Sequence, residues 1–317
     1  MSESRGTARG LNSRLHRAYN TSFTLLAILM VSILLLGWSC NAIDRDEPIP
    51  SYLHIAEYEL SVPSDNSQGS AATDIRDVWL DVNGQSIGVF EVPVTVPVLD
   101  NNDDLLVLAQ AGVRNNGRSD NRIRYPFYKI YRDTIKRIEG ALDTIRPVIT
   151  YIDGAVFPWL EDFEDRTISM EIQSDLSTID TFRLTGDSAE VYNYNTKNRF
   201  SAYLDLGTGE QNVECWSIPT FDFPRGRAVY LEIHFRTDVL LTFGIIPMDN
   251  DIQAGRVSIL TLKETGGQWN KAYISLGEDI NNQSYDDMNF KVFMSAFNDG
   301  TKTNPKVFID NIKVIHQ

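Results

Sequence analysis

Short runs of β-branched and aromatic residues, each closed by a cluster of turn residues, limit most strongly what this chain can fold into. After residue 160 no stretch has the long apolar period of an amphipathic helix. Clusters of Gly, Asn, Asp and Thr separate the runs, for example at 185–187, 207–209 and 298–300. One of the runs is 189–194, which we expect to be a strand. About ten strands in roughly 160 residues predict a double-sheet jelly roll over residues 158–317.

Residues 51–155 have the same character, and two local signals place strands there. Asn83-Gly84 lies between two β-rich runs, and both central residues of a type I′ hairpin turn need a positive φ, which Asn and Gly tolerate. Pro93 and Pro97 bracket a short run, which predicts an edge strand because proline cannot donate to a ladder. The sequence predicts an Ig-like β-sandwich here, so we expect the exported chain to be all-β. For residues 134–142 it allows either a helical turn or an irregular ribbon.

The N-terminus has the three parts of a secretory signal peptide. Residues 1–21 carry four arginines and the single acid Glu3, and residues 22–37 carry no charge. The apolar run is shorter than the roughly 20 residues that a membrane-spanning helix needs. A basic region followed by a short apolar region and a small residue predicts a cleaved signal peptide at 1–39, with an acidic linker at 40–50.

Ser39-Cys40 resembles the lipobox of Bacteroidetes-type lipoproteins. The resemblance implies that Cys40 receives a diacylglyceryl group and that the chain is cut before it. The sequence departs from the pattern at Gly37, where the family usually has Leu or another aliphatic residue, and Leu36 lies one place further back. The alternative is an uncleaved signal anchor with Cys40 as an ordinary thiol.

The acidic residues Asp44, Asp46 and Glu47 follow Cys40 closely. Acids at this place resemble a signal for display on the outer face of the outer membrane. The resemblance therefore implies a cell-surface lipoprotein, and the alternatives are the periplasmic face and a plain solvated linker.

Charge excludes some partners. The chain has a net charge of −14, and without the four arginines and Glu3 of the leader it keeps 25 basic and 42 acidic residues. Such a surface repels nucleic-acid phosphates and anionic lipids, so we expect no nucleic-acid partner and membrane attachment through acyl chains. If Cys40 is lipidated, Cys215 has no partner for an intrachain disulfide, and we expect a buried thiol in a strand.

Two short motifs at the ends of the second half resemble one fold family. Phe163-Glu164-Asp165 and the run 307–314 (VFIDNIKV) are similar to the first and last strands of carbohydrate-binding-module or galactose-binding-like jelly rolls. The resemblance implies a structural calcium ion where these strands meet, held by Glu164 or Asp165 together with Asp310. Carboxylate oxygens suit such a hard cation. The acidic cluster 161–165 has two other interpretations, a pair of glycosidase carboxylates and a solvated turn.

Aromatic residues in the second half are candidates for a sugar-binding face, because flat rings stack on sugar rings. We single out Trp216 and Trp269, with Tyr192, Tyr194 and Tyr203 as further candidates. The alternative is that these side chains belong to the core, which is common at strand spacing.

Neither of two other motifs assigns a chemistry. Residues 84–88 match G-x-S-x-G, but a nucleophile elbow needs a strand, a strained turn and a helix, whereas here a hairpin turn precedes Ser86 and a strand follows. The basic segment 114–124 could dock an acidic partner or lipopolysaccharide phosphates, or it is a polar hairpin.

We therefore expect a non-enzymatic outer-membrane lipoprotein that acts as a binding or accessory subunit of an envelope protein complex. The alternative is a glycan-binding lipoprotein of a polysaccharide capture system. A glycoside hydrolase is a third and weaker interpretation, because no catalytic constellation accompanies the acidic cluster.

Overall fold

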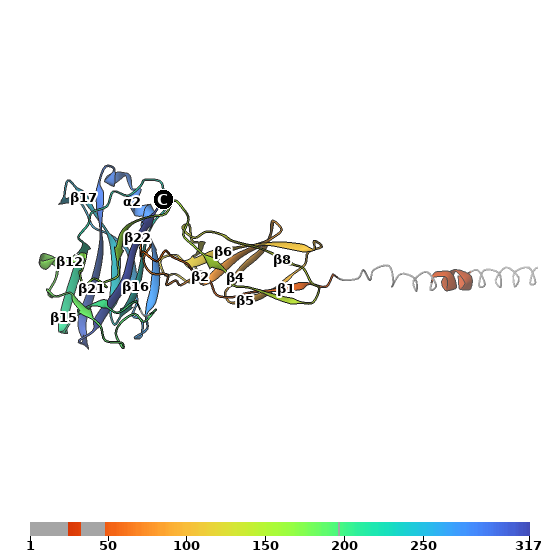
Figure 1. Ribbon diagram of the computed structural model, residues 1–317, viewed down its shortest axis with the longest axis horizontal. Coiled ribbons are helices and arrows are strands. Elements are labelled where there is room, and N and C mark those ends of the chain that lie inside the picture. The colour runs from red at the N-terminus through yellow and green to blue at the C-terminus, as the bar shows by residue number, and fades with distance from the viewer. Residues whose placement is uncertain (1–24, 33–47, 196) are drawn as a thin grey trace, which may run out of the picture. The chain divides into compact units, whose positions relative to one another are not determined.

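The computed structural model describes residues 25–32, 48–195 and 197–317 (Figure 1). Cys40 and most of the expected signal peptide and linker therefore lie outside the described residues. Residues 25–32 form an α-helix, and no described helix is both long enough and apolar enough to cross a membrane. The chain divides into two compact units, Met1–Ile49 and Pro50–Gln317, and the following sections concern the second unit.

The first β-sandwich has three sheets. A five-stranded sheet has the order β4-β3-β6-β7, with β8 also paired to β6; a three-stranded sheet has the order β5-β1-β9; β10 pairs with β2. These strands are β1 (Ser51–Ile55), β2 (Glu59–Leu60), β3 (Asp77–Val82), β4 (Gln85–Glu91), β5 (Val94–Val98), β6 (Asp104–Arg114), β7 (Arg122–Arg124), β8 (Tyr131–Lys136), β9 (Leu142–Ile145) and β10 (Val148–Ile149).

The second β-sandwich has two six-stranded sheets. One has the order β13-β14-β22-β16-β20 with β11 paired to β22, and we call it the β22 sheet; the other has the order β12-β15-β21-β17-β18 with β19 paired to β17, and we call it the β21 sheet. Its strands are β11 (Val156–Glu161), β12 (Met170–Ile172), β13 (Arg183–Thr185), β14 (Ser201–Asp205), β15 (Thr208–Ser217), β16 (Val229–Thr237), β17 (Leu240–Asp249), β18 (Ile252–Gln253), β19 (Val257–Leu262), β20 (Asn270–Ser275), β21 (Asn289–Thr303) and β22 (Lys306–His316).

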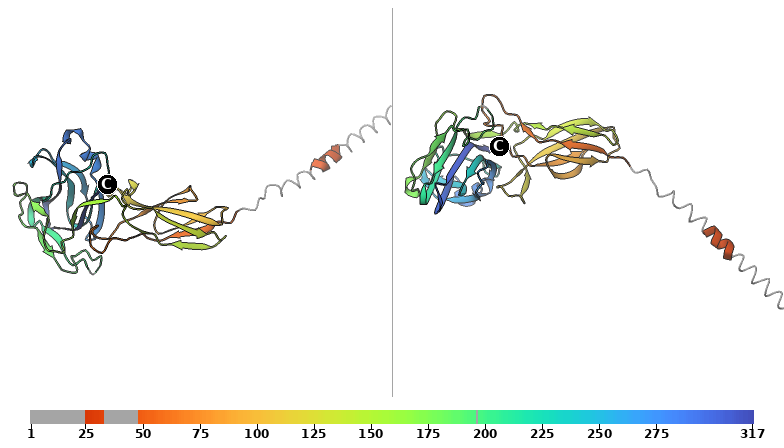
Figure 2. Two further views of the ribbon diagram at one scale, coloured as in Figure 1. Left: turned by 45° about the horizontal axis from the view of Figure 1, so that its top comes forward. Right: turned by 90° about the horizontal axis from the view of Figure 1, so that it is seen from below.

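The prediction of an all-β chain built of β-sandwich sheets is confirmed. The helical elements described in this unit are single turns: η2 (Ser174–Leu176), α2 (Gly277–Ile280) and η3 (Gln283–Tyr285). The two sandwiches appear as separate groups of strands in each view, orange to yellow-green for the first and green to blue for the second (Figure 2).

Several local predictions can be compared with the structure. The β3–β4 hairpin turns at Asn83 and Gly84 with φ of 50° and 78°, as a type I′ turn requires, and β5 is an edge strand. Residues 134–142 contain no helix. β8 ends at Lys136, turn and irregular residues follow, and β9 begins at Leu142. The strand expected at 189–194 is wrong, since this segment consists of turns and irregular backbone.

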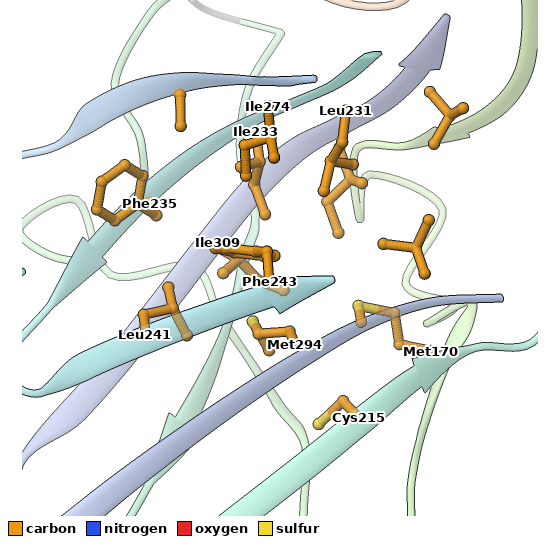
Figure 3. Packing of buried hydrophobic residues seen from close by; sticks show 14 of the residues in the cluster. Met170, Cys215, Leu231, Ile233, Phe235, Leu241, Phe243, Ile274, Met294 and Ile309 are labelled. Atoms are coloured by element: carbon orange, nitrogen blue, oxygen red, sulfur yellow. The ribbon is translucent and has the colours of Figure 1, made fainter. Parts of the chain in front are cut away.

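The core of the second sandwich lies between its two sheets (Figure 3). Ile233 and Ile309 come from the β22 sheet, and Phe243 and Met294 from the β21 sheet. Fully burying a side chain of this size stabilises the fold by about 1.5–3 kcal/mol. Cys215 lies in the same core and is fully buried, which confirms the expectation of a buried free thiol.

A buried polar cluster joins the two sandwiches. Lys271 Nζ lies 2.6 Å from Glu232 Oε2 on the second sandwich, and both side chains are almost fully buried. Tyr125 of the first sandwich donates to Glu232 Oε1 at 2.7 Å, and Lys313 Nζ donates to the hydroxyl oxygen of Tyr151 at 2.7 Å. Because buried charges need partners, this cluster fixes how the two sandwiches pack.

Candidate functional site

A polar groove lies beside the junction of the two sandwiches, and we call it the main groove. Its volume is about 590 Å³. One wall is the segment 62–71 that follows β2. The other wall is formed by residues 194, 195 and 197–199, which precede β14 and which we call the loop. The lining residues are Val62, Pro63, Ser64, Asn66, Gly69, Ser70, Ala71, Asp162, Glu164, Tyr194, Asn195, Lys197, Asn198, Arg199 and Asn311.

Side chains within the loop hold its shape. The Asn195 side chain accepts from the backbone N–H of Lys197 at 2.8 Å and of Asn198 at 3.2 Å, which is the bonding of an Asx turn. Asn198 Nδ2 donates to the carbonyl oxygen of Tyr192 at 2.9 Å. These bonds replace a strand ladder, which explains why 189–194 is not a strand.

The two motifs that flank the second half meet beneath this loop. β11 pairs antiparallel with β22, so Glu161 lies opposite Ile312. Glu164 Oε1 accepts from the backbone N–H of Arg199 at 2.6 Å and of Phe200 at 2.9 Å, and its other oxygen pairs with the Arg199 guanidinium at 3.1 Å. Glu164 therefore anchors one end of the loop.

Asp310 anchors the loop from below. It accepts from Asn198 Nδ2 at 2.9 Å, from the backbone N–H of Asn311 at 2.7 Å and from the Ser201 hydroxyl. β22 carries one extra residue against β16 between Asp310 and Lys313, and Asn311 takes a φ of 48° at this bulge. Asn tolerates the left-handed region, so the Asp-Asn pair of the motif produces the bulge that brings both side chains under the groove.

The predicted calcium ligands are only partly together. Glu164 and Asp310 both hold the loop, whereas Asp165 accepts from the backbone and hydroxyl of Thr167 within its own turn. Among the described residues, no three His, Cys, Asp or Glu side chains form a group that could hold a metal ion. Calcium binding stays a prediction.

Burial raises the pKa of the Asp310 carboxyl to about 7, although hydrogen bonds from Ser201, Asn198 and Asn311 lower it. An unfolded aspartate has a pKa of about 3.9, so the folded chain binds more protons between about pH 4 and pH 7. The free energy of unfolding must then fall as pH rises through this window, by at most about 1.4 kcal/mol per pH unit from this group.

We expect Asp310→Asn to reduce this slope, because the amide does not titrate. Urea unfolding of the full chain at several pH values between about 4 and 7 measures the slope directly. Equal slopes in the natural chain and the variant would show that Asp310 does not titrate in this window.

The opposite wall of the groove is tied to the second sandwich. Asn66 Nδ2 donates to Asp162 Oδ2 at 2.8 Å, and Lys313 Nζ donates to the carbonyl oxygen of Ser70 at 3.1 Å. Gly69 has a φ of 67°, and a Cβ there would come within 3.1 Å of the Leu160 and Lys313 side chains. Both walls are therefore fixed by named contacts.

Aromatic rings continue from the groove over the outer face of the β22 sheet. Tyr194 is 42% exposed and stacks on Tyr192 with ring centroids 6.2 Å apart. Tyr192 in turn stacks on the buried His234 at 4.3 Å and lies 5.3 Å from Trp269. Tyr194 is thus the exposed end of a supported aromatic series.

The structure does not bring the two predicted tryptophans together. Trp216 is on β15 of the β21 sheet, is only 8% exposed, and packs with Ile246, Met248 and Phe293. Its ring N–H donates to Glu214 at 2.8 Å. Trp269 precedes β20 on the other sheet and is half-buried. Of the two, only Trp269 belongs to the aromatic series next to the groove.

Most of the groove's amide and basic side chains were not candidates from the sequence, whereas Asp162 and Glu164 lie in the acidic cluster 161–165. Asn66, Asp162, Asn198 and Asn311 come from four separate segments, and only the fold brings them together. Tyr192 and Tyr194 were candidates, although the strand then expected around them is absent. The spacing of Tyr192 and Tyr194 and the pair Asp310-Asn311 were the sequence signals that could have pointed to this groove.

The basic segment 114–124 has little free charge. Arg114 and Arg122 pair with Glu91, and Arg118 pairs with Asp120. The neighbouring Asn116 bonds to the second sandwich, since its side chain accepts from the backbone N–H of Ser275 at 2.9 Å. The segment is a polar hairpin in which three of the four arginines are paired and Arg124 lies over the Trp79 ring.

Ser86 lies on β4, directly after a hairpin turn. The strand–turn–helix geometry of a nucleophile elbow is absent at this place, as the sequence analysis expected.

No protein-family model and no curated protein matches the chain. The structure is similar to several solved structures. The module TmCBM61, in complex with β-1,4-galactotriose, matches at 12% identity and a TM-score of 0.34, covering 48% of this chain and 92% of the module. Module CBM27-1 of Caldicellulosiruptor saccharolyticus, in complex with mannohexaose, matches at 16% identity and a TM-score of 0.34, covering 51% of this chain and 97% of the module.

A third similar structure is a carbohydrate-binding module of the β-sandwich superfamily, at 13% identity and a TM-score of 0.36, covering 76% of this chain and 85% of that one. At this level of likeness, these structures by themselves assign neither a ligand nor a partner to this chain.

Proposed function

We propose that residues 50–317 form a non-catalytic module that binds a carbohydrate in the main groove. The observation that carries this proposal is the position of the exposed Tyr194 ring at the rim of a groove lined by amide and charged side chains. A sugar presents an apolar face of C–H groups and a rim of hydroxyls, so it needs both kinds of partner. An aromatic body with few precisely placed polar groups is typical of small-ligand sites.

The groove supplies the polar partners from a rigid frame. Asn66 and Asn311 each donate within the protein and Asn195 accepts there, so a hydroxyl can use the oxygens of Asn66 and Asn311 and the amide N–H groups of Asn195. Lys197 and Arg199 add donors, and Asp162 and Glu164 add acceptors. Because the loop is held by Glu164, Asn195 and Asp310, binding costs little conformational entropy.

Docking of an envelope protein through the basic segment has less support. Three of its four arginines are already paired with Glu91 or Asp120, so the segment offers little free charge to an acidic partner. We therefore place glycan binding ahead of the accessory-subunit role that the sequence favours.

Replacing Tyr194 with alanine tests the proposal. The full chain is first screened on a glycan array, and the affinity for the best glycan is then measured by calorimetry. We expect Tyr194→Ala to weaken binding at least about tenfold, which is about 1.4 kcal/mol. The matched control is Tyr52→Ala, since Tyr52 is 40% exposed on β1 of the first sandwich and does not line the groove. Equal losses in both variants, or no glycan bound by the natural chain, would reject the proposal.

We also propose that Cys40 carries the acyl chains that hold this module on the outer membrane, facing the cell surface. Support comes from the sequence: the basic leader, the uncharged run 22–37 and the Ser-Cys pair. We expect Cys40→Ala to move the protein out of the membrane fraction, measured by fractionation with immunoblotting. An unchanged fractionation would favour the uncleaved signal anchor, and protease treatment of intact cells distinguishes the two faces of the membrane.

A further inference from the structure

The main groove does not end at Tyr194. A second groove, of about 380 Å³, is lined by Glu57, Tyr58, Glu59, Leu60, Ala71, Thr73, Asp74, Ile75, Arg76, Val92 and Tyr194. It shares Ala71 and Tyr194 with the main groove, so the Tyr194 side chain stands between two adjoining hollows. One ring therefore contributes to both.

A third groove adjoins the second. Its volume is about 390 Å³, and it shares Glu57 and Glu59 with the second groove. The remainder of its lining comes from the first sandwich: His54, Ala56, Pro93, Arg146, Pro147 and Val148. The three grooves thus form one continuous band that starts at the loop of the second sandwich and continues along the first.

The charge of the second groove is negative. Asp74 pairs with Arg76 at 2.5 Å, which leaves the exposed carboxylates of Glu57 and Glu59 without an ion pair in the described part of the chain. Partial burial, and to a smaller extent the nearby charge of Glu59, raises the pKa of the Tyr194 hydroxyl. In the main groove, Asp162 and Glu164 balance Lys197 and Arg199.

From the shared Tyr194 and this charge distribution we propose that the band binds the interior of an extended glycan chain, over both sides of Tyr194, and selects against acidic sugars. The inference rests on the proposed function and specifies its ligand class. A band of adjoining open grooves accommodates several consecutive sugar units, whereas a single closed pocket accommodates a chain end. In the second groove, where Asp74 already pairs with Arg76, a uronate or sulfate beside Glu57 and Glu59 would be repelled, whereas Arg146 offsets part of this charge in the third groove.

Chain length is the first test. The full chain is titrated by calorimetry with β-1,4-linked neutral oligosaccharides, from disaccharide to hexasaccharide. Affinity must keep rising beyond the length that fills the main groove. Thr73→Trp, which places a large ring in the second groove, must weaken binding of the longest probe by about tenfold while leaving that of the shortest unchanged.

Charge is the second test. Oligomannuronates, which have the same β-1,4 linkage, must bind about fivefold more weakly than β-1,4-linked mannooligosaccharides of equal length at low salt, with a smaller difference at high salt. The double variant Glu57→Gln/Glu59→Gln must reduce that difference, whereas Glu278→Gln, an exposed acid in α2, must not.

The outcomes separate this inference from the proposed function. If short glycans bind and Tyr194→Ala abolishes binding, but affinity does not change with length and the variants in the second groove have no effect, the extended-chain inference is wrong and glycan binding stands. If acidic probes bind as tightly as neutral ones at low salt, the selection against acidic sugars is wrong. If no probe of any length binds, both proposals fail.

Discussion

Replacing Glu232 with glutamine should lower the free energy of unfolding by about 4 kcal/mol. Burial alone raises the pKa of Glu232, but the charges of Lys271 and Lys313 outweigh it and hold this pKa below the usual value. Glu232 is therefore a buried carboxylate, 2.6 Å from the Lys271 ammonium. The glutamine keeps the shape but leaves the lysine charge buried without a counter-charge, which is the costly case for a buried pair.

The measurement is urea unfolding of the full chain, followed by fluorescence. The matched control is Glu171→Gln, because Glu171 pairs with Lys291 at 3.2 Å but is 50% exposed, and such a surface pair contributes about 1 kcal/mol or less. Combining Glu232→Gln with Lys271→Met should recover part of the loss, because the unpaired charge is removed as well. If Glu232→Gln is as stable as Glu171→Gln, the buried polar cluster does not hold the two sandwiches together.

Replacing Gly244 with alanine should cost about 3 kcal/mol. Gly244 lies on β17 at a bulge in its pairing with β19. A Cβ there would lie 2.0 Å from the carbonyl oxygen of Val257 and 2.4 Å from the Phe293 ring. The first of these atoms is backbone in the paired strand, so the side chain cannot be accommodated unless β17 and β19 separate.

Gly255→Ala is the control for this variant. A Cβ at Gly255 would meet its nearest neighbour, the Tyr285 hydroxyl, at 3.6 Å, which is ordinary van der Waals contact. We expect Gly255→Ala to change the midpoint of thermal unfolding by little and Gly244→Ala to lower it clearly, by scanning calorimetry of the full chain. Equal midpoints would mean that the β17–β19 bulge adjusts without cost.

Local sequence patterns predict the fold of this chain better than they predict its groove. The class of fold follows from local rules: turn residues such as Asn83-Gly84 between short β-branched runs allow little else. The Cys215 environment followed in the same way, from a thiol in an apolar strand. Local rules failed at 189–194, where tyrosines and a valine favour a strand but side-chain bonds from Asn198 and Asn195 hold a loop.

The sequence by itself determined the sandwich class, because strand period and turn chemistry depend on neighbours along the chain. The sequence also singled out the motifs at 163–165 and 307–314 as a calcium site. In the structure, their Glu164 and Asp310 hold the loop of the main groove through hydrogen bonds. Only the tertiary structure decided that Trp216 is buried and Tyr194 exposed, since burial depends on which face of a sheet meets its partner. Only the tertiary structure brought Asn66, Asn198 and Asn311 together, because contacts between residues more than a hundred positions apart leave no periodic signal in a single sequence.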